Sequence, residues 1–361
     1  MSDVRVSMDP GNLGPMPRPA TEPWRAKNPA RTRKVLLASV VPAVIALALT
    51  LGFHIHPAAG LVVIFLPLQL FGSIWAGVNL YGKKGAADAS LVVFTIFFST
   101  LVGVLLSSVV WSVVSQGLQA MSWQFISQNN VYVTPTTSLE YGGVGHAVLG
   151  TILIVGLTTL LTVPVGLLVA VYLTETRSKL RNTVRTLVQA MSGLPSVVSG
   201  LFIYSAFVIQ FGYAGWFGSL ALLPLMLPTV ARVAEEALRL VSADLRNGAL
   251  ALGAPAYRAF LQVTLPAAKS GLITAVILGV ARVIGETAPL LLTVNNANST
   301  TLDMAKPMAA LPSYIFQFIG GVYSTSIDRA WGAALVVLIL VAVLFTSARL
   351  VGRPKRASKR K

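Results

Sequence analysis

The sequence predicts an all-α, polytopic membrane protein with about eight transmembrane helices. Hydrophobic residues make up 55% of the 361 residues and charged residues only 11%, which is about half the charged fraction of a typical soluble domain. The apolar residues also fall in long blocks, and roughly 20 apolar residues are what a helix needs to cross a bilayer. The chain has no cysteine, so disulfides and thiolate chemistry are excluded.

Eight apolar blocks follow one another along the chain. They cover 35–53, 58–80, 90–115, 146–174, 188–212, 216–233, 268–292 and 330–350. The block 216–233 is short and contains Pro224 and Pro228, which a span tolerates where its neighbours satisfy the freed carbonyl groups. Residues 1–34 are rich in proline and poor in apolar side chains, so we expect a disordered cytoplasmic tail there.

The distribution of Lys and Arg predicts the orientation, because cytoplasmic loops are enriched in both. Cationic residues precede the first block and fill the basic tail 353–361, so both termini are expected in the cytoplasm, which requires an even number of spans. The loop 116–145 has no Lys or Arg, and the loop 293–329 has only Lys306 and Arg329, so both are expected outside. This asymmetry explains the net charge of +16 without a nucleic-acid partner.

The inner segment 242–266 predicts two short helices rather than an irregular loop. Ser242 is a suitable N-cap, and Gly253 is placed to adopt the left-handed conformation after the first helix. Pro255 suits the first position of a second helix, and Pro266 is expected to end it before the next span.

The two short helices present a small apolar face. Ala249, Leu250 and Leu252 are expected to lie next to Tyr257 and Phe260. Exposed at the membrane surface, this knob suits a soluble partner protein. The alternative interpretation is an amphipathic hairpin that packs on itself and lies on the lipid.

The span 268–292 contains two charged residues, Arg282 and Glu286. Arg282 lies roughly 18 Å along the helix, and burying it near mid-membrane costs about 2.5–3.5 kcal/mol. Glu286, four residues on, is expected on the same helix face. Arg suits a tetrahedral oxyanion through its planar fork of donors, and Glu286 would hold that fork or accept the proton of a hydrogen phosphate. The alternative is a structural salt bridge between helices.

The inner segment also resembles a known signature. Its pattern is Asn247-Gly248-Ala249, three residues, Gly253, nine residues and Val263-x-Leu265-Pro266. This resembles the coupling signature of ABC importer permeases, in which Glu-Ala-Ala begins the pattern, so Asn247 and Gly248 are departures from it. The resemblance implies docking in a groove of the ATP-hydrolysing subunit. The residues it assigns to coupling are Asn247, Gly248, Ala249, Leu250, Leu252, Gly253, Tyr257, Leu265 and Pro266.

Three further motifs resemble the phosphate ABC permeases, and more specifically their A-type subunit. They are Ala281-Arg-Val-Ile-Gly-Glu-Thr-Ala-Pro-Leu-Leu291, Gly193-Leu-Pro-Ser-Val-Val-Ser-Gly-Leu-Phe202 and Glu236-Ala-Leu-Arg-Leu-Val241. The resemblance covers about residues 143–352.

The resemblance implies a type I ABC importer permease core in residues 90–352, preceded by an extra N-terminal helical pair in residues 35–89. It also implies that Pro195, Ser196 and Thr287 line the substrate path together with Arg282 and Glu286.

The implied assembly is a heterodimer with a second phosphate permease subunit, above an ATP-binding subunit dimer and below an extracytoplasmic phosphate-binding protein. It would import inorganic phosphate across the lipid of the bacterial plasma membrane. This chain has no Gly-x-x-x-x-Gly-Lys-Ser/Thr loop, the loop that cradles nucleotide phosphates. We therefore expect no cofactor in this chain and no enzymatic activity of its own; the partner ATPase would use ATP and Mg.

Three alternatives compete with this interpretation. The first is an ABC permease for another oxyanion, such as sulfate or molybdate. The second is an ion-driven secondary carrier, which usually has repeats with broken helices in both halves; no repeat is visible. The third is a membrane-embedded enzyme, but apart from Arg282 and Glu286 the spans offer almost no ionisable groups from which to build a catalytic set.

Overall fold

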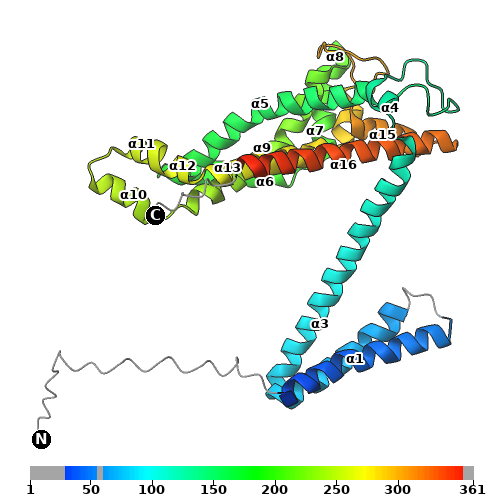
Figure 1. Cartoon of the computed structure of the whole chain (residues 1–361). Coiled ribbons are helices and arrows are strands. Elements are labelled where there is room, and N and C mark those ends of the chain that lie inside the picture. Colours follow the sequence, from blue (N-terminus) through cyan, green and yellow to red (C-terminus); the bar gives the residue numbers. More distant parts are fainter. Residues whose placement is uncertain (1–28, 55–59, 353–361) are drawn as a thin grey trace, which may run out of the picture. The chain divides into compact units, whose positions relative to one another are not determined.

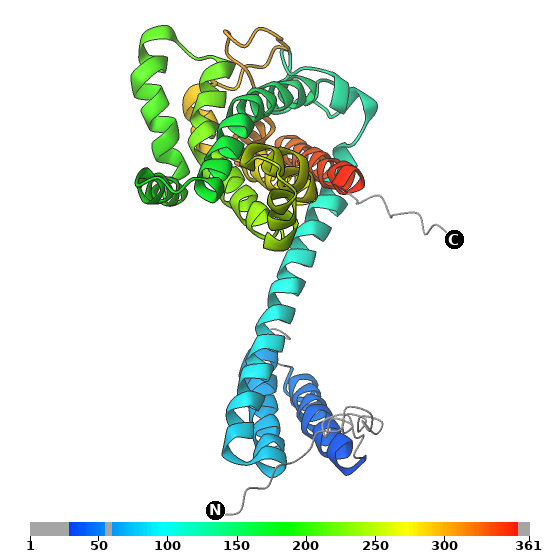
Figure 2. The ribbon, with the colours of Figure 1, turned by 90° about the vertical axis from the view of Figure 1, so that its left-hand side faces the viewer.

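The structure is a computed structural model that describes residues 29–54 and 60–352, shown in Figures 1 and 2. Every named element in these ranges is a helix. Five helices among the described residues are long and apolar enough to cross a membrane, or seven if each of two bent helix pairs forms one span. The shorter apolar helix Leu36–Gly52 corresponds to the first expected span, so each of the eight apolar blocks folds as helix.

The chain divides into two compact units, the first ending at Ser108. Its described elements are α1 (Pro29–Gly52), η2 (Gly60–Phe65) and the first part of α3 (Leu66–Ala120). Gly82 breaks α3 with φ 69° and ψ −158°, a conformation that glycine adopts readily, so Gly60–Leu80 and Gly82–Ala120 are separate candidate spans. Most of the expected tail 1–34 and all of 353–361 lie outside the described residues, but Pro29 already begins α1.

The second unit begins at Val109 and contains the remaining helices. In chain order they are α4 (Trp123–Ser127), α5 (Gly145–Glu175), α6 (Leu180–Ser192), α7 (Ser196–Ile203), η3 (Tyr204–Val208), α8 (Ile209–Phe211), α9 (Gly215–Arg239), α10 (Ala243–Ala251), α11 (Ala256–Ala259), η4 (Phe260–Thr264), α12 (Leu265–Ala267), α13 (Lys269–Ile284), α14 (Ala288–Thr293), α15 (Leu311–Ile319) and α16 (Ser324–Gly352).

Helix α9 is the centre of the second unit and packs against α5, α6, α7, α13 and α14. Val230 on α9 is fully buried, and glycines on both flanking helices let their backbones approach it. A Cβ at Gly166 of α5 would lie 2.9 Å from Val230 Cγ1, and one at Gly279 of α13 would lie 2.6 Å from Val230 Cγ2. Both distances are too short for a side chain, so these two glycines set the spacing of the core.

Two spans that the sequence predicts as continuous helices are broken. The block 188–212 is the pair α6 and α7, bent by 96°; Pro195 there is extended, with φ −60° and ψ 132°, and a proline also disfavours helix in the residue before it. The block 268–292 ends its helix at Ile284 and restarts as α14 at Ala288. Apolar composition marks both segments as membrane-embedded but carries little information on where the helix is interrupted.

The two ends of the second unit differ in structure. Helices α10 and α11 project from one end, whereas α4 and the loop that follows it lie at the other end, beside α15 (Figure 1). Each candidate functional residue therefore lies at the α10–α11 end, at the α4–α15 end, or on the long helices between these two ends.

Candidate functional site

The break in the seventh apolar block carries the two charged residues singled out by the sequence. Arg282 is in the last turn of α13 and Glu286 is in the non-helical segment after it. Because the helix ends at Ile284, the prediction that the two share one helix face is wrong. Neither side chain has an ion-pair or hydrogen-bond partner among the residues that the structure describes, so the predicted pair is not formed within this chain.

Arg282 is exposed on the surface of the single chain, and Glu286 and Thr287 are half-buried. Thr287 is at the N-cap position of α14, and its Oγ1 donates a long hydrogen bond of 3.5 Å to the Gly285 carbonyl. An exposed guanidinium in an apolar span is unfavourable in lipid. No side chain among the described residues pairs with it.

The bend between α6 and α7 brings the other predicted path residues to the same region. Pro195 is exposed at the bend, and Ser196 is the half-buried first residue of α7. Helix α7 packs against α14 so closely that a Cβ on Gly200 would lie 2.6 Å from the Pro289 Cα. The motif around Pro195 and the motif around Glu286, far apart in the sequence, are thus neighbours through α7 and α14.

The hairpin formed by α10 and α11 has the predicted caps. The Ser242 side chain accepts a hydrogen bond from the Asp244 N–H at 3.3 Å, and Gly253 has φ +82°. The Gly253 N–H donates to the Leu250 carbonyl at 3.0 Å and the Ala254 N–H donates to the Ala249 carbonyl at 3.1 Å, which is a Schellman motif. The predictions for Ser242 and Gly253 are confirmed.

The two prolines of the segment differ from their predicted roles. Pro255 is the extended N-cap of α11, not its first helical residue, and Pro266 does not end the helical segment, which continues to Ala267 and bends by 67° before α13. The π-helical turn η4 (Phe260–Thr264) ends two residues before Pro266. Such a π-helical turn is one of the usual ways in which a helix accommodates an interruption.

The hairpin exposes most of its predicted coupling residues. No residue of α10 is buried, and Leu252 is 90% exposed. Tyr257 is also exposed, with the Arg258 guanidinium 5.9 Å from its ring centre. The remaining members are exposed at Asn247, Gly248, Leu250 and Pro266 and half-buried at Ala249 and Leu265. An apolar knob that stays uncovered by the described part of the chain fits a docking surface.

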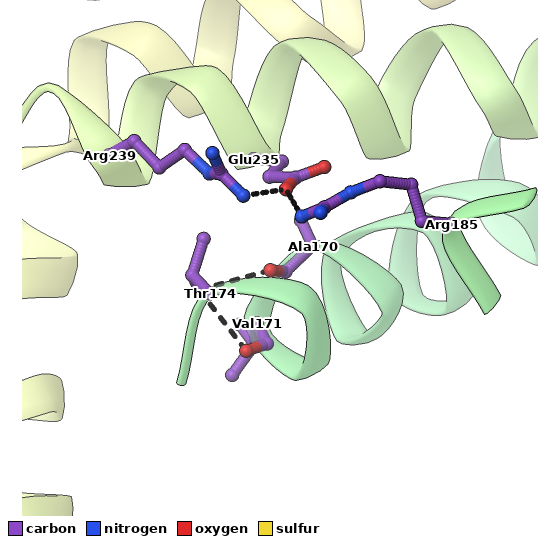
Figure 3. Close-up of polar contacts among 6 residues, drawn as sticks. All are labelled: Ala170, Val171, Thr174, Arg185, Glu235 and Arg239. Carbon is purple, nitrogen blue, oxygen red and sulfur yellow. Dashed lines mark hydrogen bonds and ion pairs between the residues drawn. The ribbon is translucent and has the colours of Figure 1, made fainter. Parts of the chain in front are cut away.

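The sequence analysis missed an ionic cluster between α6 and α9. Glu235 Oε1 accepts hydrogen bonds of 2.6 Å from both Arg185 Nη2 and Arg239 Nη2 (Figure 3). The Glu235 side chain is only 12% exposed. The Glu235–Arg239 spacing of four residues was a usable signal, whereas nothing in the sequence pairs Glu235 with Arg185.

A second missed contact joins α10 to the end of α5. Arg246 Nη1 lies 3.0 Å from Glu175 Oε1, and Arg246 Nη2 lies 2.6 Å from Glu175 Oε2. This two-pronged geometry is the strong form of an Arg–carboxylate contact. No sequence pattern identifies it, because the partners are 71 residues apart.

Arg329, which the sequence places in an outer loop, is instead in the first part of α16 and fully buried. Its Nη2 donates to the carbonyls of Ser138 and Tyr141 at 2.8 and 2.7 Å, with a longer contact to Thr137. Burial raises the pKa of neighbouring Tyr314 to about 12, against the opposing effect of Arg329, so the Tyr314 hydroxyl stays protonated at neutral pH. The three carbonyls that Arg329 contacts belong to the loop between α4 and α5, so Arg329 ties this loop to α16.

Metal binding finds no support in the described part of the chain, where no group of three or more His, Cys, Asp or Glu side chains could hold an ion.

Comparison with known proteins identifies the family of this chain. Residues 162–354 match the family model described as "Binding-protein-dependent transport system inner membrane component". The phosphate transport system permease protein PstA 1 of Mycobacterium tuberculosis is 36% identical over 72% of this chain and 87% of its own length. The PstA permease of Pasteurella multocida is 34% identical over 67% of this chain and 86% of its own.

A likeness to solved structures supports the fold. The MetNI methionine ABC transporter, in its inward-facing conformation, has a chain that matches with a TM-score of 0.50 and 20% identity, over 58% of this chain and 94% of that one.

Proposed function

This chain belongs to the binding-protein-dependent transport system inner membrane components, among the PstA-type phosphate permeases, and on that premise we propose how it works as the permease subunit of an ATP-driven phosphate importer. It forms one half of the translocation path, and a second permease subunit forms the other half. As a transport subunit it has no catalytic role; an ATP-binding subunit dimer supplies the energy from ATP and Mg, and an extracytoplasmic binding protein delivers phosphate.

The observation that carries the site assignment is the unpartnered, exposed guanidinium of Arg282 at the break of an apolar span. In a heterodimer this surface faces the second permease subunit, which removes the charge from lipid. The planar fork of Arg282 then binds the phosphate oxygens, and Glu286 at the break accepts the proton of hydrogen phosphate. Thr287, Pro195 and Ser196 belong to the same region through the contact of α7 with α14.

Orientation and coupling complete the proposal. The protein is a multi-pass plasma membrane protein with α10, α11 and both termini in the cytoplasm, an orientation supported by the Lys and Arg residues that flank the spans. The exposed knob of α10 and α11 docks in the ATPase subunit. Closure of the ATPase dimer moves that knob, and the movement opens or closes the region around Arg282.

The substrate is tested by ATP-dependent uptake of labelled phosphate into proteoliposomes that contain the complete complex. We expect uptake to require ATP and the loaded binding protein, and an excess of unlabelled phosphate to compete, whereas sulfate and molybdate do not. A guanidinium fork accepts any tetrahedral oxyanion, so another oxyanion is the second candidate. Competition by sulfate or molybdate, with no transport of phosphate, would contradict the phosphate assignment.

A further inference from the structure

The docking helix α10 is tied to the end of α5, just before the turn into α6. Glu175 is the last residue of α5, and Arg246 of α10 contacts both of its carboxylate oxygens at 2.6 and 3.0 Å. Within the residues that the structure describes, this is the one side-chain hydrogen bond or ion pair that links α10 to the spans. Since α10 buries no residue, this ion pair is its side-chain connection to the segment that leads into α6, which begins at Leu180.

Helix α6 itself is joined to α9 near its middle. Arg185 of α6 shares Glu235 with Arg239, the last residue of α9, and both contacts measure 2.6 Å. Residues 240–242 then lead directly into α10. Two ionic clamps therefore flank the start of α6. Arg246–Glu175 holds the end of α5 that leads into α6, and Arg185–Glu235–Arg239 holds α6 itself. Both involve residues on or next to the docking knob.

The far end of α6 leads to the candidate path. After the 96° bend at Pro195, α7 packs with Gly200 on Pro289 of α14. Pro289 is three residues beyond Glu286 in the chain. Ser199 of α7 also donates a hydrogen bond of 2.6 Å to the Ala221 carbonyl of α9, so α7 is tied to α9 as well as packed on α14.

We propose that α6 acts as a lever: it moves as a rigid helix and transmits the closure of the ATPase dimer to the phosphate path. The two ionic clamps couple α6 to the docking segment during this movement. The inference rests on the proposed function, in which α10 docks on the ATPase. Two-pronged Arg–carboxylate contacts suit this role because they fix orientation as well as distance. Glu175, Arg246, Arg185 and Glu235 are thus positioning residues, which touch neither phosphate nor ATP.

The test measures coupling in the complete reconstituted complex, as the number of ATP molecules hydrolysed for each phosphate ion transported. Glu175→Arg and Arg246→Glu each place like charges in the first clamp. We expect each to raise this ratio about fivefold or more, the size of a modest coupling energy between sites. The double variant Glu175→Arg with Arg246→Glu restores an opposite-charge pair and is expected to return the ratio to within about twofold of the parent, as for directly interacting residues.

The second clamp has a matched control on the same helix. Glu235→Gln removes the shared carboxylate and is expected to raise the ratio, whereas Glu236→Gln alters the next residue, which is exposed and has no ion-pair partner in the described chain, and should leave it unchanged. The amount of ATPase subunit that co-purifies should be normal in all variants. The proposed role of α6 would be wrong if the single variants hydrolysed a normal number of ATP molecules for each phosphate ion transported. It would also be wrong if the double variant showed no improvement over the single variants.

One further variant separates this inference from the proposed function. Gly253→Val forces a β-branched residue into φ +82°, which such residues resist, so docking itself should fail and co-purification should drop. If Gly253→Val has no effect, docking by α10 is wrong. If Gly253→Val disrupts docking but the clamp variants couple normally, the proposed function stands and the lever alone is rejected.

Discussion

At the scale of single residues, the charged side chains of the helices fall into two groups, those with a partner in this chain and those without one among the described residues. Glu235 and Arg329 are paired with named groups inside the chain, whereas Arg282 has none among the described residues. A charge that a membrane protein leaves unpaired at an exposed position within a span is costly. The contrast supports the proposal that Arg282 meets its partners in the assembled transporter.

Arg329 provides a stability prediction. Arg329→Met removes the donor that serves the carbonyls of Ser138 and Tyr141, and a hydrogen bond to a charged group contributes about 1.5–3 kcal/mol. We therefore expect a loss of about 2 kcal/mol or more, measured as thermal unfolding of the purified complex in detergent. Lys306→Met is the control, because Lys306 is exposed and pairs with Asp303 only at 3.7 Å, so an equal effect of both variants would contradict the assigned role.

Which residues could be predicted depended on how far away their partners are in the sequence. Ser242 and Gly253 act on backbone groups a few residues away, so their roles were visible in the local pattern. For Glu235, the pair with Arg239 could be predicted from their spacing of one helical turn, whereas the pair with Arg185 could not. Arg185, Arg246 and Arg329 bind partners 50 or more residues distant, and only the fold brings those groups together.

At the scale of helices, the interruptions carry the function. Hydropathy predicted the positions of the apolar segments, because burial in lipid depends on composition. It did not predict that two segments break at Pro195 and at Gly285–Thr287, because proline and glycine occur in continuous spans as well. The assumption of a continuous helix is also why Glu286 was wrongly placed on the same face as Arg282.

The contact between α7 and α14 gives the prediction at this scale. Gly200→Ala would place a Cβ 2.6 Å from the Pro289 Cα, a backbone atom that cannot move aside alone, and overpacking of this kind typically costs about 1–3 kcal/mol. We expect lower phosphate transport together with a lower unfolding temperature.

The matched control for this contact is Gly156→Ala on α5. No atom lies within 4 Å of the Cβ that this change adds, and alanine favours a helix over glycine by about 1 kcal/mol. Gly156→Ala should therefore be neutral or stabilising. Transport that is equal in Gly200→Ala and Gly156→Ala would show that α7 and α14 do not need their close approach.

At the scale of the whole molecule, the proposed function makes this chain one subunit of a larger transporter. The knob of α10 and α11 is exposed, and so is Arg282; the proposed function assigns each of these surfaces to a different partner subunit. The sequence predicted the membrane-spanning architecture and the family, because both rest on composition and on short motifs. It did not predict the ionic clamps, which join α6 to α9 and α10 to the end of α5. The division of the chain into an N-terminal helical pair and a permease core at residue 90 stays a prediction.

The most direct test of the central claim compares the parent complex with Arg282→Gln in ATP-dependent uptake of labelled phosphate, with Arg177→Gln as control. Arg177 is exposed in the turn between α5 and α6, so its loss should leave uptake unchanged. We predict that Arg282→Gln assembles with all subunits but that its phosphate uptake rate falls at least about tenfold. The reason is that a hydrogen bond to a charged group contributes about 1.5–3 kcal/mol. Normal uptake by the assembled Arg282→Gln complex would contradict this prediction and make Arg282 a structural residue.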